Sequence, residues 1–112
     1  MSRPSLREPA SDPSPIFAAL GDRTRLSLLL TLSDGQSRSI ASLSADKQLT
    51  RQAITKHLHV LEDAGLVSSI RIGRESRFAY SPGSIADATS YLATVSAQWD
   101  EALSRLRSLV ED

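Results

Sequence analysis

The chain has 112 residues, and its 13 basic and 13 acidic side chains give a formal net charge of zero. This length suits one small domain with a modest core. The absence of cysteine excludes disulfides, zinc–thiolate sites and thiol catalysis. The chain also has no run of about 20 apolar residues, the length that would span a membrane.

The N-terminal segment differs in composition from the rest of the chain. Residues 1–15 contain four prolines, charged side chains and no apolar run, so they do not form a secretory signal. We expect a disordered tail over residues 1–14 and one folded domain over residues 15–112. The expected location is the cytoplasm, with no membrane partner.

Two helices are predicted in the first part of the domain. Ser14 is expected to cap the first, with Pro15 at its first helical position and Gly21 after its end. Asp22 is expected to cap the second, which stops at the turn Asp34-Gly35. The apolar stripe predicted for this second helix consists of Leu26, Leu29, Leu30 and Leu32.

A helix–turn–helix unit follows. Ser39 is expected to cap a short third helix, and residues 46–48 form a tight turn. Thr50 then caps a fourth helix that runs to about Ala64. Three- and four-residue spacing predicts its inward positions: Ala53 or Ile54, Leu58 and Leu61.

The hydrophobic period then changes from helix to strand and back. Residues 66–72 and 76–80 alternate around a glycine-bearing loop and predict a β-hairpin. A final helix begins near Ser81-Pro82 and carries an apolar stripe over about seven turns, formed by Ile85, Ala88, Leu92, Val95, Trp99, Leu103, Leu106 and Val110. The fold is therefore mainly α with a small β-hairpin wing, in the order α-α-α-α-β-β-α of a winged helix-turn-helix.

Charge is distributed unevenly along the domain. Residues 47–77 contain six basic and three acidic side chains, whereas residues 81–112 contain two basic and five acidic ones. A local basic zone of this kind favours double-stranded DNA as a partner. The predicted DNA contacts are on the fourth helix and the hairpin: Thr50, Arg51, Gln52, Thr55, Lys56, His59, Arg71, Arg74 and Arg77. The alternative to DNA contact is, for the fourth helix, an ordinary amphipathic helix with a polar outer face. For the hairpin it is a solvent-exposed turn whose edge-strand charges prevent aggregation.

The last helix is too long to be covered by one small domain, which predicts a homodimer. The expected interface combines apolar residues of the first and last helices: Phe17, Leu20, Leu92, Val95, Trp99, Leu103 and Leu106. No cofactor, metal or catalytic site is expected. His57 and His59 lack the three- or four-residue spacing of paired helical ligands, and no nucleophile–base set or phosphate-binding glycine loop is present.

Three runs at matching spacing resemble the ArsR/SmtB family of bacterial repressors. They are Phe17-Ala-Ala-Leu-Gly-Asp-Arg-Thr-Arg25, Thr50-Arg-Gln-Ala-Ile-Thr-Lys-His-Leu58 and Val60-Leu-Glu-Asp-Ala-Gly-Leu-Val67. The resemblance implies a dimer that represses from promoter DNA and is released by an inducer. It also implies contacts through Gln52, Thr55, Lys56, His59 and Arg74.

The chain departs from this family at three places. The Cys-x-Cys pair of metal-sensing members is replaced by the run at residues 40–44, and the last helix has no histidine, so we expect no metal sensing. The turn carries Lys47-Gln48 where many members have glycine. Other interpretations are a winged-helix protein-interaction module that binds no DNA, a sensor of metal or an unknown small-molecule effector at the dimer interface, and, with no catalytic pair to support it, an enzyme.

Overall fold

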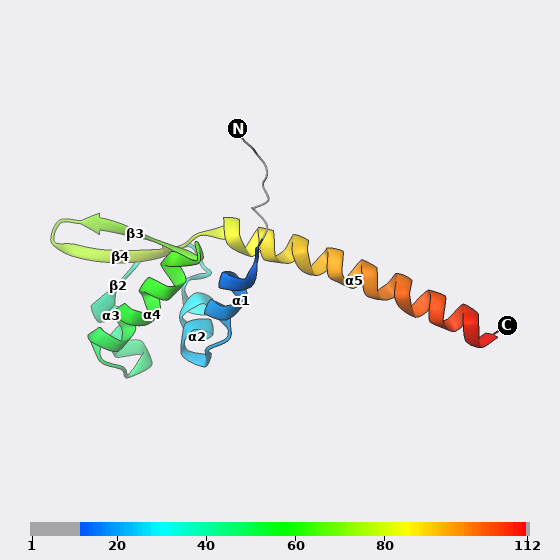
Figure 1. Ribbon diagram of the computed structural model, residues 1–112. Coiled ribbons are helices and arrows are strands. Elements are labelled where there is room, and N and C mark those ends of the chain that lie inside the picture. The colour runs from blue at the N-terminus through cyan, green and yellow to red at the C-terminus, as the bar shows by residue number, and fades with distance from the viewer. Residues whose placement is uncertain (1–11, 112) are drawn as a thin grey trace, which may run out of the picture.

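The computed structural model describes residues 12–111, so most of the predicted tail lies outside the described residues. Its elements follow the predicted order, with one added strand (Figure 1). They are α1 (Ser14–Leu20), α2 (Arg23–Leu32), β2 (Arg38–Ser39), α3 (Ile40–Lys47), α4 (Arg51–Asp63), β3 (Val67–Ile72), β4 (Glu75–Tyr80) and α5 (Pro82–Glu111). The winged helix-turn-helix fold, mainly α with a small β-hairpin wing, is confirmed.

Three of the four predicted helix caps are confirmed. The side chains of Asp22, Ser39 and Thr50 each accept a hydrogen bond from the backbone N–H three residues on, at 3.0–3.1 Å. The predicted cap at Ser14 is wrong. The carbonyl of Pro13 already accepts from the backbone of Ile16, so α1 begins one residue earlier than expected.

The wing is part of a three-stranded antiparallel sheet in the order β2-β4-β3. In its register, Ile72 faces Glu75 across the wing turn and Arg38 faces Phe78. Strand β2 is not predicted from the sequence, because two residues are too few to show an alternating pattern. This strand connects the wing to the segment before α3.

The core lies where α1, α2, α3, α4 and the inner face of the wing meet. Its fully buried large side chains are Leu28, Leu32, Leu43, Ile54, Leu58, Leu61 and Leu66. On α4, Ile54 rather than Ala53 points inward. The stripe predicted for α2 is partly wrong, because Leu26 and Leu30 are 44% and 67% exposed and Leu28 is buried instead.

Helix α5 projects away from the rest of the domain (Figure 1). Its 30 residues correspond to a length of about 45 Å. It packs against α1, where the rings of Phe17 and Tyr91 lie 6.1 Å apart, and Ala88 is its one buried residue. Within residues 12–111, no helix is long and apolar enough to cross a membrane.

Candidate nucleic-acid interface

Helix α4 presents a polar face to solvent because its opposite face is fixed in the core. Ile54, Leu58 and Leu61 are fully buried, so the helix cannot rotate without exposing them. Four polar side chains on the other side are exposed and make no hydrogen bond or ion pair with any residue in the range 12–111: Arg51, Gln52, Lys56 and His59. These groups are available to an external partner.

Thr55 and Glu62, also on α4, are bonded internally. The Thr55 hydroxyl donates to the Arg51 carbonyl at 2.7 Å, which leaves its methyl group and its acceptor lone pairs for other contacts. Glu62, at the far end of the helix, accepts from the Ser69 hydroxyl on β3 at 2.8 Å. Glu62 and Asp63 are the only acidic residues of α4, so the N-terminal half of the helix has no acidic side chain.

The turn between α3 and α4 sets the orientation of α4 relative to α3. Gln48 adopts a left-handed conformation with φ 56° and ψ 44°, which closes α3. The Leu49 backbone N–H donates to the Ser44 carbonyl at 3.1 Å, and the Ser44 hydroxyl donates to the Leu49 carbonyl. The turn therefore forms with Gln48 in the left-handed conformation that glycine adopts most readily.

A polar network joins α1, α2 and α4. The Nε of Arg25 donates to the carbonyl of Ala19 at 2.8 Å, and its Nη1 lies 3.3 Å from Nδ1 of His57. Asp22 Oδ2 lies 3.8 Å from the same ring nitrogen. The Arg25 backbone N–H, and then the charge of Arg25, hold the pKa of Asp22 below its ordinary value. His57 thus sits at the margin of the core, and its Nδ1 faces Arg25 and Asp22.

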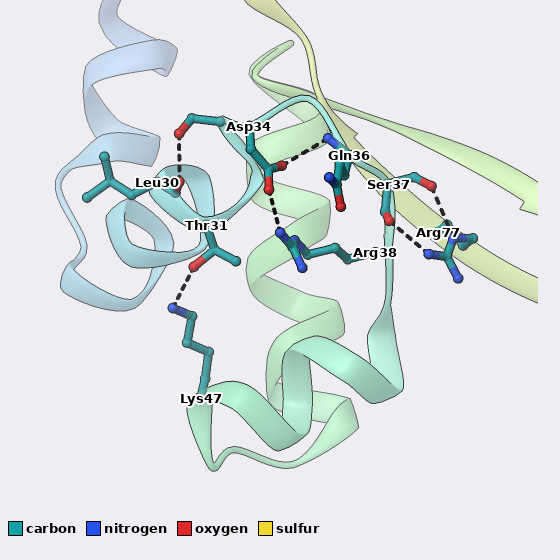
Figure 2. Close-up of polar contacts among 9 residues, drawn as sticks. Leu30, Thr31, Asp34, Gln36, Ser37, Arg38, Lys47 and Arg77 are labelled. Atoms are coloured by element: carbon teal, nitrogen blue, oxygen red, sulfur yellow. Dashed lines mark hydrogen bonds and ion pairs between the residues drawn. The ribbon is translucent and has the colours of Figure 1, made fainter.

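The wing carries two kinds of arginine. Arg71 and Arg74 are exposed and have no side-chain partner among the described residues, and the neighbouring Gly73 supplies the positive φ of the wing turn. Arg77 differs: its Nε and Nη2 donate to Ser37 at 3.1 and 2.8 Å (Figure 2). Its Nη1 lies 2.8 Å from Glu75. The guanidinium of Arg77 therefore holds the wing to the segment before β2.

The residues predicted for a dimer interface fall into two groups. Phe17, Leu20 and Val95 are half-buried, and the first two pack against the core. The other four are more than half exposed: Leu92, Trp99, Leu103 and Leu106. These four belong to the later part of the α5 stripe, which other parts of residues 12–111 leave exposed.

Residues 20–70 match the helix-turn-helix domain family HTH_20. The chain is 49% identical over 65 residues to the uncharacterized HTH-type transcriptional regulator YuzN of Bacillus subtilis, an alignment that spans 53% of this chain and 71% of YuzN. It resembles the structure of an ArsR-like transcriptional regulator from Rhodococcus sp. RHA1 with a TM-score of 0.77, at 35% identity over 87% of this chain and 91% of that one. The homodimeric winged helix-turn-helix domain of Mb0332 from Mycobacterium bovis shares the fold, with a TM-score of 0.64 at 22% identity over 88% and 92% of the two chains.

Proposed function

The chain belongs to the ArsR family of winged helix-turn-helix DNA-binding transcriptional regulators, and we propose that it is a dimeric repressor that binds an imperfect palindromic operator. One observation carries the proposal. The exposed half of α4 presents Arg51, Gln52 and Lys56 with no internal partner in the described part of the chain, on a helix fixed by a buried apolar face. Such a helix is suited to the major groove of double-stranded DNA.

The side chains divide by the contacts their chemistry suits. Gln52 and Thr55 are neutral and directional, so we assign them to base edges. Lys56 and Arg74 carry charges that need no base identity, so we assign them to phosphates. The remaining proposed contacts flank these four: Thr50, Arg51, His59 and Arg71. Arg77 is left out, because its guanidinium is engaged by Ser37 and Glu75.

The proposed dimer is formed by the first and last helices. Trp99 is 64% exposed and continues a stripe with Leu103 and Leu106, so a second copy would bury apolar area worth about 1.5–3 kcal/mol for each large side chain. The homodimeric state of Mb0332, which has the same fold, supports this arrangement. Two-fold symmetry would present two copies of α4 to the DNA.

Repression would follow from occupancy of promoter DNA in the bacterial cytoplasm. An effector of unknown chemistry would release the protein, as the family resemblance implies. We propose no cofactor and no metal for either step. The chain contains no cysteine, and α5 contains no histidine.

The test is selection of bound DNA from a random pool, followed by footprinting upstream of the protein's own gene. We expect two inverted half-sites whose centres are separated by about 34–36 Å, one helical turn. A wild-type protein that binds scrambled DNA as tightly as the best selected site would contradict the proposed function. Selected sites without inverted repeats would contradict the dimeric arrangement.

A further inference from the structure

A second basic surface lies beside the beginning of α4. An open depression of about 250 Å³ is lined by Arg23, Thr24 and Ser27 of α2 and by Lys47 and Leu49 at the end of α3. None of these residues is among the DNA contacts derived from the sequence. The depression therefore needs its own explanation.

The charges around this depression are arranged in two ways. Arg23 is exposed and has no hydrogen bond or ion pair with any described residue, so its guanidinium is available. Lys47 is held in place, because its Nζ donates to Ser27 and to Thr31 at 2.8 Å each and lies 3.3 Å from Asp46. Figure 2 shows the contact with Thr31. Since the Ser27 hydroxyl in the wall accepts from Lys47, its own hydrogen remains free to donate. The site can thus offer cationic and hydroxyl donors to an anion.

The position of the depression identifies the anion. Leu49 on its rim directly precedes Thr50, the residue that caps α4, and the free Arg51 follows. The surface is thus continuous with the end of α4 that the proposed function places in the major groove. Phosphates line both edges of that groove, so a helix that enters it brings neighbouring surfaces against the backbone.

We infer that the depression between α2 and α3 binds a backbone phosphate of the same operator, with Arg23 as its free cationic donor and Lys47 as a fixed positive charge in its wall. This inference rests on the proposed function. It extends the DNA contact surface from α4 and the wing to α2. Because the contact is to phosphate, it would add affinity without adding sequence preference.

The first test compares Arg23→Ala with Arg107→Ala, which removes an exposed α5 arginine that has no ion pair among the described residues. We expect Arg23→Ala to weaken binding to selected and scrambled DNA alike, by roughly tenfold near 0.1 M salt. The slope of log affinity against log salt should decrease by about 1.8 for a dimer with two such contacts. Arg107→Ala should leave both quantities at the wild-type value, and Arg23→Lys should retain most of the slope.

The second test locates the contact on the DNA. Single phosphates of the selected site are replaced one at a time by neutral methylphosphonates, and the affinities of wild type and Arg23→Ala are compared. At one phosphate per half-site, the replacement should weaken wild type but not Arg23→Ala. The same losses in both proteins at every phosphate, or an unchanged salt slope in a folded Arg23→Ala variant, would overturn the inference and leave the proposed function intact. A wild type without site preference would instead overturn the proposed function.

Discussion

Nη1 of Arg25 on α2 lies 3.3 Å from Nδ1 of His57 on α4, which links α2 to the helix that we propose contacts DNA. An arginine can only donate, so Nδ1 of His57 is the acceptor in this contact. Arg25 also donates to Ala19 and Ala18 at the end of α1. One guanidinium therefore joins three helices.

Arg25→Ala is expected to destabilise the fold by about 1–3 kcal/mol, because it leaves carbonyl groups of α1 and the ring of His57 without their donor. The free energy of unfolding in urea measures the loss. Arg23→Ala is the matched control: it removes an arginine two positions away that has no internal side-chain contact with described residues, and should change stability little. Equal stability of the two variants would contradict the structural role of Arg25.

Asp22 gives a prediction for the dependence of stability on pH. Its pKa is held below 3.8 in the folded chain, chiefly by the backbone N–H of Arg25, so its charge stabilises the fold above the unfolded pKa. That contribution is lost as pH falls through the lower, folded pKa. Asp22→Asn can still accept at the helix cap but does not titrate. Urea midpoints at pH 7 and pH 3 should therefore differ less for Asp22→Asn than for wild type; the same difference in both proteins would contradict the assignment.

Charged residues at Trp99 and Leu103 should abolish the proposed dimer. Both side chains are more than half exposed in one chain, and glutamate at each would place four like charges in a two-fold interface. We expect a monomer or an unfolded chain in sedimentation velocity, with a loss of several kcal/mol of association free energy. Gln98→Glu, next to Trp99 but on another face of α5, is the control. A double variant that stays a well-folded dimer would exclude this interface.

Substitution of Gln52 and substitution of Arg74 should weaken DNA binding in different ways. Gln52→Ala is expected to cost about 1–3 kcal/mol on the selected site and to relax preference at one base position. Arg74→Ala should weaken binding to all DNA sequences alike. It should also reduce the slope of log affinity against log salt by the amount that corresponds to about one phosphate contact per subunit. Affinities on selected and scrambled DNA across a salt series separate the two. If neither variant changes specific affinity, the proposed reading face is in the wrong place.

Zinc, cadmium and arsenite are not expected to change DNA affinity at stoichiometric levels. The chain has no cysteine, and its two histidines, His57 and His59, lie two positions apart on α4, where they point in different directions. A mobility-shift titration with each ion measures the effect, with a chelator as the control. Release of DNA at micromolar metal would contradict this prediction.

Local signals in the sequence were sufficient for most elements of the fold. The caps at Asp22, Ser39 and Thr50 act within three residues, so the sequence alone places them. Helix α2 shows the limit of such signals. Residues 28–30 are consecutive leucines, so apolar residues occupy more than one face. Packing against α4 and β4 decides that Leu28 and Leu29 are buried and Leu30 is exposed.

Contacts between distant residues were beyond the sequence pattern. Arg77 is bonded to Ser37, which lies 40 positions earlier and directly before β2. That strand has only two residues, so it shows no periodicity of its own. The charge of Arg77 and its place in the hairpin predict a DNA contact, whereas its bonds to Ser37 leave no signal in the sequence. The depression at Arg23 and Lys47 likewise exists only because α2 and the end of α3 come together in the folded chain.

The left-handed conformation of Gln48 has a consequence for the unfolded chain. This backbone region costs a residue with a Cβ about 1–2 kcal/mol, and glycine would remove that cost. Glycine would also give the unfolded chain more conformations, and this conformational entropy must be lost on folding. The two effects oppose each other, so the turn can carry glutamine where many family members have glycine at little net change in the folding equilibrium.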